Sequence, residues 1–122
     1  MTRFLAWIPA AVWAGAIFYL SSRPRLPGPE LPGIDKVAHF AAYALLASLL
    51  IFATERSRLP LAAAVVLALL YGASDEIHQM YVPGRSPDVL DWFADAAGVA
   101  AATLVYVRRR AAAGSGAPLP SA

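Results

Sequence analysis

The chain has no cysteine and little charge, with only 15% of its 122 residues charged. Without cysteine, disulfide bonds and thiolate metal sites are excluded. Soluble domains typically carry about 25% charged residues, whereas this chain is 59% hydrophobic and has a mean hydropathy of +0.56. It also lacks a nucleophile elbow, a phosphate-binding loop and a zinc-binding helix motif. Composition therefore indicates one compact membrane domain and carries no motif that identifies an enzyme.

Four apolar segments follow one another along the chain, at residues 4–20, 37–53, 59–73 and 89–107. A membrane-spanning helix needs roughly 17–25 residues, and each segment reaches this length once the polar turn at its end is included. A soluble bundle is the competing interpretation, but near-uniform apolar segments leave no face for solvent. We therefore expect an all-α, polytopic membrane protein, a bundle of four transmembrane helices. Cleavage of the first segment as a signal peptide is disfavoured, because Tyr19 and Leu20 stand where small residues are wanted.

The basic residues predict the orientation of the bundle, because cytoplasmic loops carry an excess of lysine and arginine. In a four-span layout the larger basic group lies on one side and consists of Arg3, Arg56, Arg58, Arg108, Arg109 and Arg110. The smaller group lies on the other side and consists of Arg23, Arg25, Lys36 and Arg85. We therefore expect a multi-pass membrane protein with both termini in the cytoplasm.

The sequence predicts one folded domain and one tail. Residues 1–110 form the expected four-helix membrane domain, and residues 111–122, rich in Ala, Gly, Pro and Ser, form an expected disordered cytoplasmic tail. Residues 22–33 contain four prolines and predict a stiff external loop. The net charge of +2 does not indicate nucleic-acid binding, because the arginines flank apolar spans and form no single basic face.

Three polar clusters interrupt the apolar pattern, each at the end of a span. They consist of Asp35, Lys36, His39 and Tyr43, then Ser74, Asp75, Glu76, His78 and Gln79, then Arg85, Asp88, Asp91 and Asp95. The predicted topology places all three at the outer membrane face, and intervals of three and four residues put their side chains along single helical faces. Charged groups inside a membrane are costly and usually functional. We therefore expect the clusters to meet in one polar vestibule.

The chemistry of single side chains predicts their roles. Arg85 follows a Pro-Gly turn signal, and its guanidinium suits two-pronged binding of a carboxylate or phosphate. Asp91 needs a cationic partner, which we expect to be Lys36 or Arg85. Asp88 is expected to cap the fourth helix, and Asp35 is either a cap of the second helix or a functional group.

The clusters also form a recognisable combination of motifs. It consists of Asp35-Lys36-x-x-His39 with Tyr43, Ser74-x-Glu76-x-x-Gln79, Pro83-Gly84-Arg85-x-x-Asp88-x-x-Asp91, and finally Asp95 and Gly98. In this combination the chain resembles the VanZ-like family of small membrane proteins, over residues 34–107. The family pattern more often has asparagine where this chain has Asp95, and Gly98 is expected to permit close helix packing. The resemblance implies a membrane fold, a shared site and a link with teicoplanin-type glycopeptide resistance in bacteria.

Two classes of function fit these residues. The first is binding of a polar or anionic cell-envelope component, such as a cell-wall precursor, at the outer face. The second is a membrane-embedded hydrolase or transferase for a lipid-linked or phosphorylated envelope substrate, with Glu76 and His39 as acid and base. We favour binding, because an enzyme would need a nucleophile and only Ser74, the aspartates or a water are available. The predicted ligand-binding residues are Lys36, His39, Tyr43, Glu76, Gln79, Arg85, Asp88, Asp91 and Asp95.

No metal or cofactor is expected at this site. Glu76 and His78 are two residues apart and face different sides of a helix, and the chain has no His-x-x-x-His pair. Lys36 and Arg85 would also oppose a cation. The expected partners are the lipid bilayer and an envelope ligand, without nucleic acid, and homo-oligomerisation is left open.

Overall fold

The structure, a computed structural model, describes residues 2–23, 33–85 and 88–115. Four α-helices make up most of this part: α1 (Thr2–Ser21), α2 (Ile34–Arg56), α3 (Leu61–Gln79) and α4 (Val89–Ser115). All four are long and apolar enough to cross a membrane. The expected all-α bundle of four membrane-spanning helices is therefore confirmed.

Most helices extend beyond their apolar segments, and two of their ends need explanation. α3 begins at Leu61, two residues later than expected, because Pro60 precedes it in an extended conformation. α4 continues to Ser115, so the first part of the expected tail is helical, consistent with the high helix propensity of its alanines. Residues 116–122, the rest of that tail, and residues 24–32 of the proline-rich segment lie outside the described residues.

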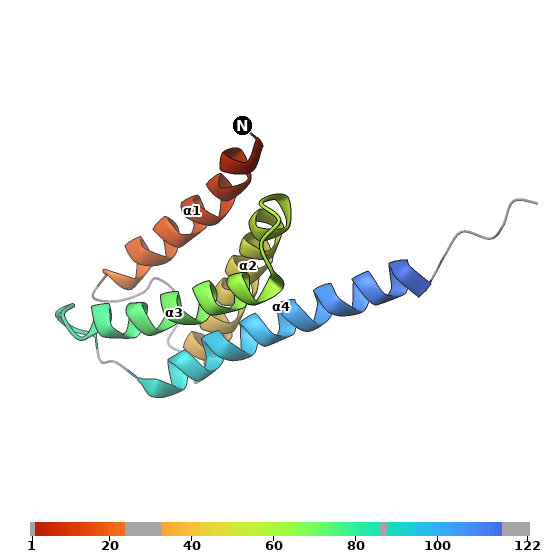
Figure 1. The fold of residues 1–122 in the computed structure, drawn as a ribbon. Coiled ribbons are helices and arrows are strands. Elements are labelled where there is room, and N and C mark those ends of the chain that lie inside the picture. Colours follow the sequence, from red (N-terminus) through yellow and green to blue (C-terminus); the bar gives the residue numbers. More distant parts are fainter. Residues whose placement is uncertain (1, 24–32, 86–87, 116–122) are drawn as a thin grey trace, which may run out of the picture.

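α2 is the central helix of the bundle, and it contacts each of the other three. α4 runs parallel to α2, because Lys36 near the start of α2 contacts Asp91 at the start of α4, and Glu55 near its end contacts Arg110. α1 and α3 run antiparallel to α2, since Trp7 at the start of α1 donates to Ser57 just after α2 and Tyr43 in α2 donates to Asp75 late in α3. Figure 1 shows this arrangement, with the C-terminal part of α4 extending past the other helices.

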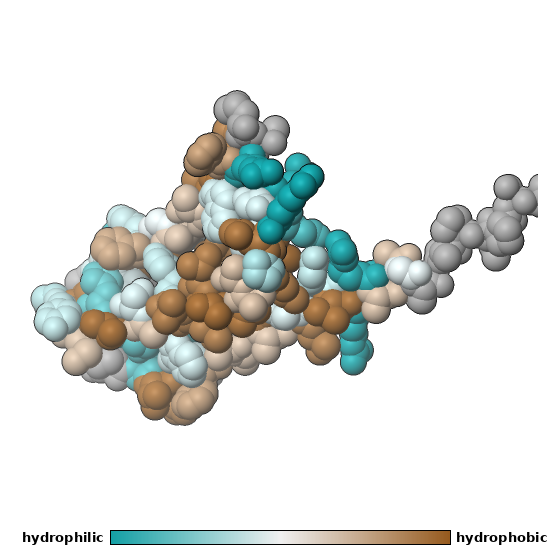
Figure 2. Space-filling model, in the orientation of Figure 1, coloured by the Kyte–Doolittle hydropathy of each residue, from teal (hydrophilic) through white to brown (hydrophobic). Residues whose placement is uncertain are grey.

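Apolar side chains fill the interior and also cover the outside. The core is centred on α2 and consists of Tyr43, Leu46, Ala47, Leu50 and Ile51 with Ala10, Ile17, Ala64, Ala68 and Val99. Large apolar side chains also point outward, among them Phe4, 82% exposed, and Leu70, 62% exposed. Figure 2 shows a broad hydrophobic surface between hydrophilic regions. Such an exterior suits a bilayer, where the outer face of each helix meets lipid.

Close backbone approach holds α2 and α4 together at Gly98. A Cβ atom at this position would lie 2.2 Å from the backbone oxygen of Phe40 and 3.0 Å from the backbone nitrogen of Ala44. Only glycine fits such a crossing, because any side chain would collide with the backbone of α2. The prediction of close packing at Gly98 is confirmed, and this crossing sets the distance between the first turns of α2 and α4.

Aromatic side chains tie the remaining interfaces. The Trp13 indole nitrogen donates to the Ala42 carbonyl across α1 and α2, at 2.9 Å. The Trp92 indole nitrogen donates to the Leu69 carbonyl across α4 and α3, at 3.2 Å, and the Tyr71 hydroxyl donates to the Ala14 carbonyl across α3 and α1. A helical carbonyl has a second lone pair free for such a bond. Each of these three helix pairs is therefore joined by a hydrogen bond, which lipid chains cannot provide.

Candidate functional site

The three polar clusters meet at one end of the bundle, where α1 and α3 end and α2 and α4 begin. Direct contacts join them: Lys36 of α2 binds Asp91 of α4, and Tyr43 of α2 donates to Asp75 of α3. The backbone N–H of Asp88 donates to Glu76 Oε2 at 3.1 Å. The expected convergence is therefore confirmed. That this end faces the outside of the cell stays a prediction.

Lys36 is the central cation of this end. Its Nζ lies 2.8 Å from Asp35, 2.9 Å from Asp88 and 2.6 Å from Asp91. Asp91 is only 6% exposed, and the Lys36 ammonium group pairs directly with its carboxylate. Of the two partners predicted for Asp91, Lys36 is confirmed and Arg85 is not.

Asp88 fixes the start of α4. Its Oδ1 accepts a hydrogen bond of 2.9 Å from the backbone N–H of Leu90, which is the geometry of an N-terminal cap. Its other oxygen accepts from the Lys36 ammonium, and this bond holds the pKa of the Asp88 carboxyl below its usual range. The predicted capping role of Asp88 is confirmed, and the cap links the first turn of α4 to α2.

Asp35 does not cap α2. The residue before this helix is Gly33, at φ 79°, and no side chain caps the helix there. Asp35 lies inside the first turn, where its carboxylate pairs with Lys36. Capping of α2 by Asp35 is therefore wrong, because the helix begins at Ile34, two residues earlier than that role requires.

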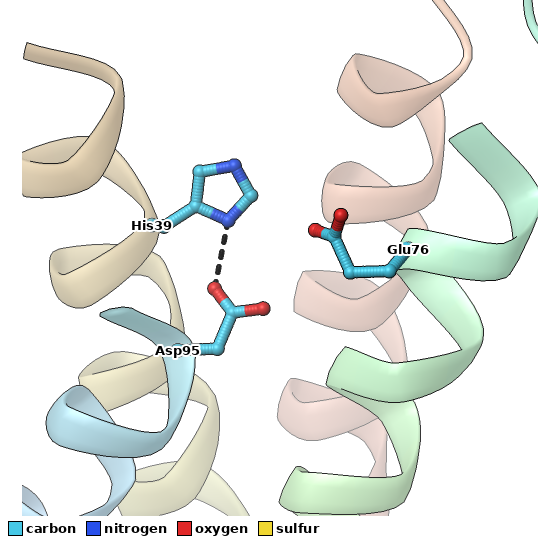
Figure 3. Close-up of side chains that lie close together, drawn as sticks. All are labelled: His39, Glu76 and Asp95. Atoms are coloured by element: carbon cyan, nitrogen blue, oxygen red, sulfur yellow. Dashed lines mark hydrogen bonds and ion pairs between the residues drawn. The ribbon is translucent and has the colours of Figure 1, made fainter. Parts of the chain in front are cut away.

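His39, Glu76 and Asp95 form a more deeply placed group. His39 Nδ1 lies 2.7 Å from Asp95 Oδ1, and His39 Nε2 lies 3.7 Å from an oxygen of Asp91. One atom each from His39, Glu76 and Asp95 falls within 4.8 Å of the others. Figure 3 shows the three side chains pointing toward one another from α2, α3 and α4. An imidazole beside two carboxylates can exchange protons or bind a cation, and a catalytic role for Glu76 and His39 stays a prediction.

Tyr43, Asp75 and Gln79 form the inner wall of the site. The Tyr43 hydroxyl donates to Asp75 Oδ2 at 3.3 Å, and all three residues are buried. Gln79 Oε1 has no hydrogen-bond partner among the described residues. Asp75 was not among the predicted ligand-binding residues. Its spacing of four residues from Gln79 places both on the face of α3 toward α2, a signal that was available in the sequence.

A small cavity of about 100 Å³ opens beside these residues. Its apolar side consists of Ile17 and Leu20 from α1 with Ala38 and Ala42 from α2, and its polar side consists of Ser21, His39, Tyr43, Asp75, Gln79 and Arg85. The surface of the cavity is almost entirely apolar although polar residues line one side of it, and it lies at the same end of the bundle as the ion pairs.

Arg85 reaches this cavity from the turn between α3 and α4. Gly84 adopts a φ of 81°, and the Arg85 backbone N–H donates to the Val82 carbonyl at 3.1 Å, so the predicted Pro-Gly turn is confirmed. The guanidinium Nη1 donates to the Leu20 carbonyl in the last turn of α1 at 3.5 Å and to the Arg23 carbonyl just after that helix at 3.0 Å. Carbonyls at the C-terminal end of a helix carry partial negative charge. Arg85 thus leans toward the end of α1 and away from Asp91.

His78 lies on a different face from Glu76, as the spacing predicts. Its ring stacks on Phe18 with centroids 4.5 Å apart, and its nitrogens lie 3.4 Å from the hydroxyl oxygens of Ser21 and Ser22. His78 therefore ties α3 to α1 and takes no part in the group of His39, Glu76 and Asp95.

Comparison with known proteins gives one match. The VanZ/LLP1 family model matches residues 2–110. Searches of curated proteins and of solved structures give no match. The matched range covers all four membrane-spanning helices up to Arg110 and every residue of the polar end described above. The chain therefore belongs to the VanZ/LLP1 family.

Proposed function

We propose that the protein binds a polar or anionic component of the cell envelope in the cavity beside Arg85, at the outer face of the membrane. The observation that carries this proposal is that Arg85 lines the cavity. The guanidinium donates to the backbone carbonyls of Leu20 and Arg23. Among the described residues, no carboxylate forms an ion pair with Arg85. A guanidinium without a carboxylate partner can bind a phosphate or carboxylate through two parallel N–H donors.

The shape and lining of the cavity support a lipid-linked component. Ligand pockets for whole small molecules are typically about 300–1,000 Å³, so a cavity of about 100 Å³ suits a small charged group. The apolar wall formed by Ile17 and Leu20 continues toward the lipid-facing surface of α1. A component with an anionic headgroup and an apolar chain would place its headgroup at Arg85 and its chain along α1.

The neighbouring charges support one anion contact at this position. Lys36 is engaged by three carboxylates, which leaves Arg85 as the cation that lines the cavity. Family membership supports a connection with teicoplanin-type glycopeptide resistance, and a site for cell-wall precursors at the outer face would be consistent with it.

The Arg85→Lys variant tests the proposal. Lysine keeps the charge but replaces the planar fork by a point charge. We expect lower teicoplanin resistance in bacteria that carry Arg85→Lys than in bacteria that carry the wild type, at equal protein level in the membrane. Arg110→Lys is the matched control, because Arg110 pairs with Glu55 at the opposite end of the bundle, and it should behave as wild type.

A binding measurement makes the test independent of the resistance phenotype. Purified protein in nanodiscs is heated with and without a polyprenyl phosphate, and the unfolding midpoint is recorded. We expect polyprenyl phosphate to raise the midpoint of the wild type and of Arg110→Lys, but to raise that of Arg85→Lys much less. An equal shift in all three proteins, or none in the wild type, would remove the support for Arg85 as the anion contact.

A further inference from the structure

His39, Glu76 and Asp95 place three metal-binding groups around one point. The three residues come from three different helices, and their ligand atoms lie within 4.8 Å of one another. Figure 3 shows the imidazole and both carboxylates directed at a shared space between α2, α3 and α4. Sequence spacing cannot identify such a group, because each residue comes from a different helix.

Both carboxylates of this group have an oxygen atom with no hydrogen-bond partner among the described residues. Asp95 is only 1% exposed, and its Oδ2 has no hydrogen-bond partner among the described residues. Glu76 Oε1 is likewise buried without a partner there. Gly72 faces Asp95 Oδ2, with its Cβ position 3.2 Å from that oxygen, and offers no side-chain donor. Native structures rarely leave buried carboxylate oxygens unpaired, because desolvation without a partner is costly.

The nearby cations are engaged elsewhere. Lys36 is held by Asp35, Asp88 and Asp91, and Arg85 donates to carbonyls at the end of α1. From the sequence, Lys36 and Arg85 were expected to oppose a bound cation. Their partners are other groups, so neither residue pairs with Glu76 or Asp95. The imidazole of His39 hydrogen-bonds one oxygen of Asp95, and the other oxygen of Asp95 and Glu76 Oε1 remain without a partner among the described residues.

We propose that His39, Glu76 and Asp95 bind a divalent transition-metal ion, with zinc as its representative. One imidazole nitrogen with two carboxylates suits zinc or manganese, whereas magnesium and calcium prefer oxygen ligands alone. Metal–ligand bonds of about 2.1 Å allow ligand atoms up to about 4.2 Å apart around one ion. The ligand atoms here lie within 4.8 Å of one another, so a pair at that limit would have to close by roughly 0.6 Å.

The ion would complete the unsatisfied groups described above. It would contact the free oxygens of Glu76 and Asp95 and join α3 to the α2–α4 pair. Gln79 lies one turn after Glu76, and its Oε1 is also buried without a hydrogen-bond partner among the described residues. Metal binding does not depend on the proposed envelope ligand, because the three residues belong to the protein itself.

Zinc uptake by the full-length protein tests this inference. Protein purified in detergent is stripped with a chelator, equilibrated with zinc, manganese or magnesium, freed of excess ion and analysed for bound metal by mass spectrometry. We expect wild type to retain zinc in equimolar amount, to retain magnesium poorly, and to unfold at a higher temperature with zinc. Glu76→Gln and Asp95→Asn should each weaken zinc affinity by about tenfold or more, since even outer-shell changes typically cost 10–100-fold.

Two matched variants separate the site from nonspecific uptake. His78→Gln removes the other histidine, which stacks on Phe18 and faces α1, and Asp35→Asn removes an exposed carboxylate at the same end of the bundle. Both should bind zinc as wild type does. Zinc loss in His78→Gln equal to that in Glu76→Gln would overturn the assignment, as would the absence of equimolar zinc in wild type.

A measurement on wild type alone covers the case in which the variants fail to fold. X-ray absorption of the zinc-loaded protein should show only nitrogen and oxygen ligands, with the outer-shell scattering of a single imidazole. Spectra without imidazole scattering would exclude His39 as a ligand and refute the site. Neither result depends on Arg85, so failure here and failure of the envelope-binding proposal are distinguishable.

Discussion

Replacing Gly98 with alanine is expected to push α2 and α4 apart. The new Cβ atom would lie 2.2 Å from the Phe40 carbonyl oxygen, whereas a carbon–oxygen contact needs about 3.3 Å. The two helices must therefore separate locally by roughly 1 Å. Backbone atoms provide the obstacle, so no side-chain rotation can relieve it.

The magnitude follows from two opposing effects. Overpacking of a closely packed interface typically costs about 1–3 kcal/mol, and replacing glycine by alanine in a helix returns up to about 1 kcal/mol. We expect a net loss of about 2 kcal/mol in the free energy of unfolding, because the obstruction is rigid. Separation by roughly 1 Å would also lengthen the nearby contact of His39 with Asp95, now 2.7 Å.

The measurement is unfolding of the purified protein in detergent, followed by helical circular dichroism and tryptophan fluorescence. Gly15→Ala is the matched control, because a Cβ at Gly15 in α1 has no atom within 4 Å. It should leave stability unchanged or raise it slightly. If Gly98→Ala proved as stable as Gly15→Ala, the close approach of α2 and α4 would be refuted.

Two further predictions concern charge and topology. Lys36→Met should destabilise the protein by about 3–5 kcal/mol, because it leaves the buried carboxylate of Asp91 without its cation. Arg110→Met removes an exposed ion pair and should cost only about 0–1 kcal/mol in the same unfolding assay. Equal losses in the two variants would contradict the central role of the Lys36–Asp91 ion pair. Since the chain has no cysteine, Tyr81→Cys and Leu59→Cys report the topology through a membrane-impermeant thiol reagent applied to intact cells. Tyr81→Cys should react and Leu59→Cys should not, and the reverse pattern would place the polar end in the cytoplasm.

The helices and the meeting of the clusters could be predicted because both depend on one-dimensional information. Apolar length defines a span, and alternating topology brings the start of α2 and the end of α3 to the same end. That Asp91 pairs with a cation followed from the need to neutralise a buried carboxylate, whereas the choice of Lys36 over Arg85 did not. Capping by Asp88 followed from its place just before an apolar helix.

The detailed contacts could not be predicted, because they depend on helix crossings and side-chain directions. Arg85 donates to the end of α1, and its direction is set by the turn at Gly84, whose positive φ is a local backbone property. The approach of His39 to Asp95 depends on how closely Gly98 lets two helices meet. Motif spacing within one helix specifies neither the direction of a side chain nor the distance between two helices. The group of His39, Glu76 and Asp95 can therefore be identified only in the structure.

The parallel arrangement of α2 and α4 has a consequence for how the protein enters the membrane during synthesis. α4 carries Asp91 and Asp95 in its first two turns, and acidic residues raise the free energy of inserting a helix on its own. Lys36 and His39 are translated earlier, on α2, so their side chains are in place when the last helix leaves the ribosome. Because α2 is synthesised before α4, its basic side chains can pair with the aspartates of α4 as that helix inserts. α4 therefore need not insert as an isolated segment.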